Sequence, residues 1–338
     1  MPESASKSPR KKRLLSGMRP TGRLHLGNYV GALENWVGLQ DEYESYHFVA
    51  DWHTLTTDYE HTRLIRGNTL EMVTDWLAAG LDPRKSPFFI QSQVKQHAEL
   101  HLLLSMLITT ARLERNPTLK EQIRDLELEA RVTYGHLGYP VLQAADILMY
   151  KGEAVPVGED QLPHIEVTRE IARRFNNVFS PDRPVFPEPE GVLSNFPRLP
   201  GLDGRRMSKS LGNTILISDS PEEIQKKMRQ AVTDPQKIRR NDPGHPDICL
   251  VFAYQNRFNG DIVPEIRQGC ESGALGCVDC KQRCAASIIE HLAPVRERRQ
   301  HYESHPGEVE EIIADGTARA GRTAEATMRE VHDVMGFG

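Results

Sequence analysis

The feature that most constrains the fold is an alternation, beginning at Leu14, of short apolar runs with amphipathic helical patterns. Candidate strands lie at 14–15, 46–50 and 88–90, and each is followed by a segment whose apolar residues recur at helical spacing. Strands that alternate with helices in this way are typical of βα units around a parallel sheet. The sequence therefore predicts an α/β fold with a doubly wound parallel sheet.

Helical patterns also mark the middle of the chain. Apolar residues define one face of a helix in 29–37 and again in 65–77, where Gly80 is a stop signal. Residues 97–150 are mainly helical in pattern. By contrast, six prolines crowd 181–200, and because each one removes a backbone donor and clashes with the preceding turn, we expect an irregular connection there.

The C-terminal part of the chain has a different pattern. After residue 212 the sequence is helical almost to its end, with Ile224, Met228 and Val232 at four-residue spacing. A chain of 338 residues is long enough for two cores, so we expect two domains. The predicted organisation is a disordered basic arm at 1–13, an α/β domain at 14–212 with a helical insertion at about 97–150, and a helical domain at 213–338.

Composition narrows the cellular setting. Hydrophobic residues make up 38% of the chain, and no apolar run approaches the roughly 20 residues that a membrane helix needs. The basic arm is not followed by a hydrophobic segment that would serve as a signal-peptide core, so we expect a cytoplasmic protein with no membrane partner. With a net charge of -5, contact with RNA must be local, and the arm is either such a contact or a solvated tail.

The first candidate ligand-binding motif is SGMRPTGRLHLGN, at 16–28, between a predicted strand and a predicted helix. At the carboxyl ends of parallel strands, the following helix presents free N–H groups and a positive dipole end to phosphate. Its glycines let the backbone approach a ligand closely, and His25 and Asn28 add side-chain donors. Since many folds place such a turn there without a nucleotide, a structural role is an equal alternative.

The second motif is RRMSKSLGN, at 205–213, which carries three cations within five residues. A mobile loop of this kind can place a cation on the charge that develops as pyrophosphate leaves, rather than on ground-state binding. Lys209 is the candidate for that role. The alternative is an exposed basic linker.

Together the two motifs resemble the HIGH and KMSKS signatures of class I aminoacyl-tRNA synthetases, which lie on opposite sides of ATP in that family. The segments SGMRPTGRLHLGNYVGAL, YPVLQAADILMY and VPVGEDQLPHIEVTRE further resemble those of bacterial tryptophanyl-tRNA synthetases, and the resemblance runs from about Leu14 to the C-terminus. It implies a Rossmann-like catalytic domain at 14–212, a dimer interface within 97–150 and an anticodon-binding domain at 213–338.

The resemblance also implies roles for single residues. Asp146, in AADIL, corresponds to the acceptor of the indole N–H, and a buried carboxylate there penalises amino acids that leave it unpaired. The implied tryptophan-binding residues are Asp146, Tyr139, Gln161, His53 and Gln143. The implied ATP-binding residues are Arg19, Pro20, Thr21, Gly27, Asn28, Gly158, Glu159, Asp160, Val192, Arg206, Met207, Ser208, Lys209 and Ser210. The implied catalytic residues are His25, Asn28, Lys120, Arg206 and Lys209.

The chain departs from the common pattern of this family at four positions. Arg19 stands where many relatives have Gln, and Arg206 replaces the first Lys of KMSKS with the charge retained. Gln143 stands where many have Met, and Leu15 where a Phe often lines the pocket. Because Gln143 and Leu15 are expected near the amino acid, they put the precision of tryptophan selection in question.

The five cysteines all fall in the C-terminal part of the chain. Cys249, Cys270, Cys277 and Cys280 follow the pattern C-x20-C-x6-C-x2-C, with Cys284 one helical turn further on. Four thiolates suffice for tetrahedral zinc or a cubane cluster, and disulfides are disfavoured in the cytoplasm. Because some of the bacterial synthetases that resemble this region carry a [4Fe–4S] cluster, that is the first interpretation, with zinc second and free thiols third.

The resemblance implies a reaction as well. Tryptophan is activated by ATP with Mg²⁺, and a homodimer then transfers it to tRNA(Trp). A tyrosyl-type synthetase is one alternative, but it needs acceptors for a phenol hydroxyl, and the GEDQ and AADIL contexts favour tryptophan. The others are a synthetase paralogue that acts as a binding or regulatory partner, and a plain nucleotidyltransferase.

Overall fold

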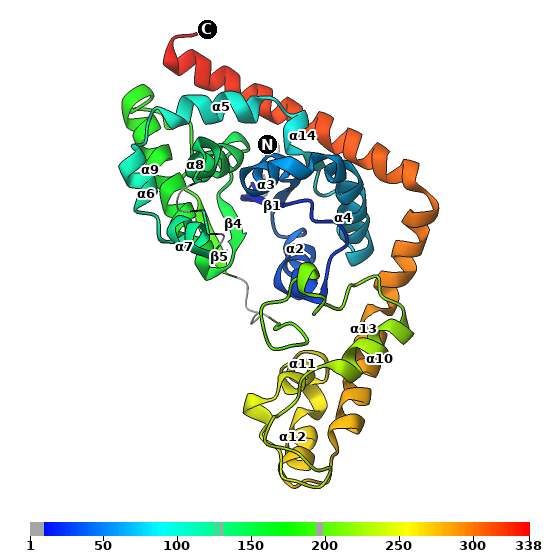
Figure 1. Ribbon diagram of the computed structural model, residues 1–338. Helices are drawn as coiled ribbons and strands as arrows, with labels where there is room; N and C mark the ends of the chain where they lie inside the picture. The colour runs from blue at the N-terminus through cyan, green and yellow to red at the C-terminus, as the bar shows by residue number, and fades with distance from the viewer. Residues whose placement is uncertain (1–9, 126, 129–130, 194–198) are drawn as a thin grey trace, which may run out of the picture.

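The fold is built on a five-stranded parallel sheet, seen in a computed structural model that describes residues 10–125, 127–128, 131–193 and 199–338 (Figure 1). The strand order is β3-β2-β1-β4-β5, so the chain moves outward from β1 first to one side and then to the other. This confirms the predicted doubly wound α/β fold. The strands are β1 (Arg13–Met18), β2 (Glu44–Val49), β3 (Phe88–Ile90), β4 (Ala154–Val157) and β5 (Glu190–Leu193).

Helices account for most of the remaining chain. The helix predicted at 29–37 is a π-helical turn, Tyr29–Leu33, that continues into α2. Gly80 ends α4 in the left-handed conformation, with φ 108°, as the stop signal predicts. The helices are α1 (Leu26–Asn28), α2 (Glu34–Leu39), α3 (Asp51–Asp58), α4 (Ile65–Ala79), α5 (Gln96–Ser105), α6 (Thr110–Glu114), α7 (Pro117–Asp125), α8 (Tyr134–Met149), α9 (Leu162–Phe179), α10 (Pro221–Gln230), α11 (Leu250–Phe258), α12 (Val263–Glu271), α13 (Cys277–Ser304) and α14 (Pro306–Met335).

Two short strands, β4 and β5, were not predicted. β5 lies inside the proline-rich stretch expected to be irregular, and it is an edge strand that pairs only with β4. Gly191 leaves room there for Leu162 of α9, because a Cβ at that position would lie 2.7 Å from Leu162 Cδ2. The helical spacing was also misleading at Val232, since α10 ends at Gln230 and Val232 is exposed.

Two long helices join the C-terminal part of the chain to the sheet. α13 runs from the lobe of α11 and α12 up to α4, and α14 then returns across β3 and α5 (Figure 1). One hydrophobic core holds Trp36 and Trp76 together with Ile288 of α13 and Ile313 of α14. Because this core contains residues from both sides of residue 212, the predicted boundary does not separate two cores. It stays a prediction about where the catalytic and anticodon-binding parts of the chain meet.

The N-terminal arm is described only in part. Residues 1–9 of the arm predicted at 1–13 lie outside the described residues. Arg13 begins β1, and Arg10 donates to Glu153 Oε2 at 2.8 Å. Over the part of the chain that the structure describes, none of the helices combines the length and the apolar character needed to cross a membrane.

Candidate active site

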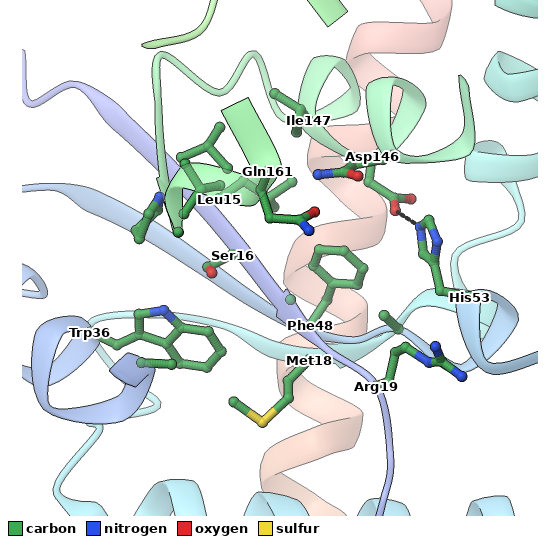
Figure 2. A pocket seen from close by; sticks show the side chains of 18 of the residues that line it. Leu15, Ser16, Met18, Arg19, Trp36, Phe48, His53, Asp146, Ile147 and Gln161 are labelled. Carbon is green, nitrogen blue, oxygen red and sulfur yellow. Dashed lines mark hydrogen bonds and ion pairs between the residues drawn. The ribbon is translucent and has the colours of Figure 1, made fainter. Parts of the chain in front are cut away.

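A cavity of about 390 Å³ opens at the carboxyl ends of β1, β2 and β4 (Figure 2). Its wall includes Gly17 and Met18 of β1, Ala50 after β2 and Gly158 after β4. The direction of the strand order reverses at β1, and open α/β sheets bind ligands at such a switch point. The topology alone thus accounts for the position of the cavity.

Most of the residues that sequence analysis placed near the amino acid line this cavity. Apolar residues that it missed, including Trp36, Phe48 and Ile147, line it as well (Figure 2). They follow the pattern of ordinary core residues, so no sequence signal set them apart. The predicted residues in the wall are Leu15, Arg19, His53, Tyr139, Gln143, Asp146, Gly158 and Gln161.

Asp146, on α8, lines the cavity although only 1% of the residue is exposed. Its oxygens accept hydrogen bonds from His53 Nε2 at 2.9 Å, His97 Nδ1 at 2.6 Å and Gln91 Nε2 at 2.8 and 2.9 Å. Burial alone raises the pKa of Asp146, but the hydrogen bonds from His53 and His97 outweigh it and lower the pKa to about 2. The cavity therefore has a buried, ionised acceptor in its wall, and Figure 2 shows His53 facing it.

Gln91 and His97 are functional candidates that sequence analysis missed. Gln91 directly follows β3, and His97 lies in the first turn of α5. Polar residues that follow a strand of a parallel sheet converge on the edge where ligands bind. This position, in the segment QSQVKQH, is the signal that would have identified both.

The other predicted polar residues of the wall are held by their neighbours. The Tyr139 hydroxyl lies 2.7 Å from His164 Nε2. Burial lowers the pKa of His164 to about 4, and its Nδ1 accepts from Asn116 Nδ2 at 3.1 Å, so the neutral ring carries its proton on Nε2 and donates to the Tyr139 oxygen. Arg19 donates to Thr57 Oγ1 at 2.6 Å, and burial lowers the pKa of the guanidinium. An apolar wall with a few fixed polar groups is typical of small-molecule sites.

The two motif loops lie against each other at the edge of this region. Lys209 Nζ donates to the carbonyl oxygen of Arg23 at 2.8 Å and also to that of Thr21. Gly27 N donates to Met207 Sδ at 3.3 Å. The structure thus brings together the two segments that sequence analysis expected to face one nucleotide.

His25 and Asn28 form a reciprocal cap at the start of α1. His25 Nδ1 accepts from the backbone N–H of Asn28, and the backbone N–H of His25 donates to Asn28 Oδ1, both at 3.2 Å. Burial, followed by the charges of Lys209 and Arg206, lowers the pKa of His25 to about 4. His25 is therefore neutral beside a cationic loop.

The basic loop is held in shape by Asn213, to which sequence analysis gave no role. Asn213 accepts from Ser208 N at 2.8 Å and donates to Asp203 Oδ1 at 2.8 Å and Arg206 O at 3.1 Å. The hydroxyl groups of Ser208 and Ser210 lie 2.9 Å apart. Arg206 and the two serines are thereby presented on one short turn.

Several residues predicted to bind ATP do not line the cavity. Lys120 is exposed on α7, and Val192 is partly buried in β5. Glu159 and Asp160 lie in the exposed turn that follows β4, and Pro20 is buried after β1. Their assignment to ATP stays a prediction.

The cysteines gather where α11, α12 and α13 meet. Burial, followed by the charges of Cys249, Cys270 and Cys277, raises the pKa of Cys280 to about 11, so these three thiols lie within electrostatic range of Cys280. Cys284 is fully buried. Across the described ranges, no three His, Cys, Asp or Glu side chains are grouped closely enough to hold one metal ion, so the zinc interpretation does not fit this arrangement.

Comparison with known proteins agrees with this geometry. A chain of Campylobacter jejuni tryptophanyl-tRNA synthetase, solved with ADP and tryptophan, superposes with a TM-score of 0.84 at 31% identity, covering 96% of this chain and 99% of that one. The tryptophan–tRNA ligase of Thermotoga maritima is 50% identical over 328 residues, covering 96% of this chain and 98% of the relative.

A second relative and a family model extend the match. The tryptophan–tRNA ligase of Aquifex aeolicus is 44% identical over 394 residues, covering 96% of this chain and 99% of the relative. Residues 7–293 match the family described as tRNA synthetases class I (W and Y). The cavity at the switch point, the two facing motif loops and these matches agree, and the chain belongs to the class I tRNA synthetases of the tryptophan and tyrosine group.

Proposed function

We propose that the protein activates L-tryptophan with ATP, releasing pyrophosphate, and transfers the tryptophan from the adenylate to tRNA(Trp). The relatives that match over nearly the whole chain are named tryptophan–tRNA ligases. The single observation that carries the choice of amino acid is the ionised carboxylate of Asp146, buried in the wall of a largely apolar cavity.

Asp146 suits tryptophan because the indole ring offers one donor and no acceptor. A side chain without a donor that displaces His53 from Asp146 leaves one carboxylate hydrogen bond unmade, which costs more than the loss of one ordinary hydrogen bond. Trp36, Phe48 and Ile147 supply the apolar surface for the ring. Tyr139 and Gln161, in the same wall, are assigned to the α-amino group.

ATP is assigned to the region of the motif loops. The tryptophan carboxylate attacks the α-phosphate in line, and the bond to pyrophosphate breaks, with Mg²⁺ bound to the departing group. The protein supplies orientation and charge, without a covalent enzyme intermediate. Lys209 and Arg206 are the cations placed to balance the charge that develops as pyrophosphate leaves, and His25, Asn28 and Lys120 are assigned to phosphate contact.

Assembly and tRNA binding complete the proposal. A two-fold homodimer through 97–150 is supported by exposed apolar side chains in this segment, which include Leu102, Met106 and Tyr134. The helical part at 213–338 is assigned to the anticodon, because unpaired bases are where RNA sequence can be recognised. A cytoplasmic location accords with a substrate that is tRNA.

A [4Fe–4S] cluster is the proposed occupant of the four thiols. A cubane cluster binds each cysteine at a separate iron, so it accepts a wider spacing than one zinc ion does. Gln255 Nε2 donates to Cys280 Sγ at 3.3 Å, a contact of the kind that tunes such clusters. Cys249, Cys270, Cys277 and Cys280 would hold it, and the group would supply structural order to the helical lobe.

ATP–pyrophosphate exchange with each amino acid tests the proposal. Exchange with tryptophan alone, followed by charging of tRNA(Trp), is the expected result. Exchange with tyrosine points to the tyrosyl alternative, no exchange points to a paralogue that acts as a binding partner, and turnover without tRNA dependence points to a nucleotidyltransferase.

Two substitutions sharpen this test. Asp146→Ala and Lys209→Ala should both lose charging severely, by about 100-fold or more, because the first removes the buried acceptor for the indole and the second removes a cation assigned to the departing pyrophosphate. Glu170→Gln is the matched control, since Glu170 is a partly buried carboxylate on α9, paired with Arg112 outside the cavity. Near-normal charging by either alanine variant would contradict its assignment.

A further inference from the structure

The donors of Asp146 fall into two kinds. Its two oxygens accept four hydrogen bonds from three side chains, His53, His97 and Gln91. A carboxylate has about four lone-pair sites, so all are filled. Only His53 lines the cavity. An entering N–H donor must therefore take the place of His53 on Oδ2, while His97 and Gln91 remain as fixed donors behind the carboxylate.

His97 is itself held by a second buried group. Its Nδ1 lies 2.6 Å from Asp146 Oδ1, and its Nε2 lies 2.8 Å from the hydroxyl of Tyr150. Both His97 and Tyr150 are fully buried. Burial raises the pKa of Tyr150 well above its ordinary value, so the phenol keeps its proton.

These contacts select one tautomer of His97. The ionised carboxylate only accepts, so Nδ1 carries the proton that His97 donates to Asp146. The phenol of Tyr150 keeps its proton and donates it to Nε2, which has a lone pair in this tautomer. The opposite tautomer would aim a lone pair at the carboxylate across 2.6 Å.

We infer that His97 and Tyr150 are positioning residues that hold the Asp146 carboxylate fixed and ionised toward the cavity, and so set the preference for an amino acid with a single N–H donor. The inference rests on the proposed function, in which Asp146 accepts from the indole. A carboxylate that is already fixed by buried donors does not reorganise when the ligand arrives, and groups behind a binding residue that fix its direction contribute strongly to affinity.

The aromatic packing around Tyr150 makes this arrangement rigid and offers a control. The ring of Tyr150 stacks on Tyr46 with 4.9 Å between centroids and contacts Phe89 at 5.1 Å. The hydroxyl of Tyr46 has different partners: it donates to Glu44 Oε1 and lies beside Thr323 Oγ1 on α14, both at 3.2 Å. Tyr46→Phe therefore removes a hydroxyl from the same aromatic cluster without touching the contact between Tyr150 and His97.

The tautomer is tested on the unmodified protein. ¹⁵N NMR of histidine-labelled protein should show His97 protonated at Nδ1 and not at Nε2, both with and without tryptophan. The resonance is assigned by its loss in His97→Asn. Protonation at Nε2, or a mixture of tautomers, overturns the inference, and this measurement does not depend on any variant being active.

The effect on recognition is tested by kinetics. In ATP–pyrophosphate exchange, Tyr150→Phe should raise the KM for tryptophan about tenfold, because it weakens the hydrogen bonds from Tyr150 through His97 to Asp146. The KM for ATP should stay within about twofold, because these residues are assigned to the amino acid and not to the nucleotide. Tyr46→Phe should leave both unchanged. An unchanged KM for tryptophan in Tyr150→Phe, or equal changes for both substrates or both variants, overturns the inference. Wild-type protein without tryptophan-dependent exchange would instead contradict the proposed function.

Discussion

The guanidinium of Arg299, on α13, donates to the carboxylate of Asp75, on α4, and both side chains are buried. The other oxygen of Asp75 accepts from the backbone N–H of Leu24 at 2.6 Å, immediately before His25. A helix from the C-terminal part of the chain thus fixes the first motif loop near its end, just before α1 begins. Burial raises the pKa of Asp75 to about 6 even beside this guanidinium.

Arg299→Met should lower the free energy of unfolding by about 3–5 kcal/mol at pH 7, because it leaves the charge of Asp75 buried without its partner. The loss should shrink between pH 7 and pH 5, since a protonated Asp75 is less costly to bury. Urea unfolding at both pH values measures this. Arg66→Met is the control. Arg66 on α4 pairs with Glu310 on α14, so this ion pair also ties α4 to the C-terminal helices, but both side chains are exposed. Its loss should therefore lower the free energy of unfolding by at most about 1 kcal/mol. Equal losses in the two variants would contradict the argument.

Gly316→Ala should detach α14 from the sheet. A Cβ at Gly316 would lie 2.0 Å from Phe88 O and 2.6 Å from Phe88 N, both backbone atoms of β3 that cannot move aside. We expect a loss of at least about 3 kcal/mol, as for severe overpacking, measured by thermal and urea unfolding. Gly321→Ala, on the same helix, meets nothing within 4 Å and should be neutral or stabilising by up to about 1 kcal/mol. A stable Gly316→Ala protein would show that this crossing is less tight than described.

The parts of the fold that were predicted from sequence are those with local signals. The pattern around β1 to β3 gave the parallel sheet, and the motif loops that carry His25 and Lys209 were expected to lie together, as they do. β4 and β5 were missed because Pro156 interrupts the first and Gly191 the second, and neither has the continuous apolar run that marked β3. The return of α14 onto β3 through Gly316 depends on shape across a long sequence separation, which periodicity does not encode.

The candidate site shows the same division. Asp146 was predicted because its sequence context resembles a known motif, whereas His97 and Gln91 are single polar residues whose partner is distant in sequence. Trp36 and Phe48 follow ordinary core spacing, so only the cavity distinguishes them. The sequence does not show which side chains donate to the Asp146 carboxylate, because His53, Gln91 and His97 come from three separate segments that meet only in the folded protein.

The neutral state of His25 predicts how stability depends on pH. The pKa is lowered to about 4, first by burial and then by Lys209 and Arg206, so the unfolded chain binds a proton between about pH 6.5 and pH 4 that the native protein does not. Stability should therefore fall as the pH is lowered through this range. Between pH 7 and pH 5 we expect His25 to account for a loss of about 1–2 kcal/mol.

His25→Asn tests this contribution, because Asn can still cap α1 but does not titrate. The variant should become more stable relative to wild type as the pH falls from 7 to 5, as measured by the free energy of unfolding. His61→Asn is a control of opposite sign, since the hydrogen bond that His61 donates to the Asp58 carboxylate raises the pKa of exposed His61, and its contribution grows as the pH falls. A pH-independent difference for His25→Asn would contradict the neutral, buried state.

The cysteines give the last prediction. Protein purified without oxygen should contain iron and sulfide and absorb in the visible range, and Cys280→Ser should abolish both, because Cys280 is assigned as a ligand and its pKa responds to Cys249, Cys270 and Cys277. Cys284→Ala is the matched control: it removes a buried thiol one helical turn away that is not assigned as a ligand, so iron should be retained. If iron is lost from both variants, Cys284 belongs to the ligand set; if zinc alone is found in wild-type protein, the cluster is excluded. Chelation of the iron should lower the thermal stability of the lobe of α11 and α12, while ATP–pyrophosphate exchange, which depends on the distant cavity, should continue.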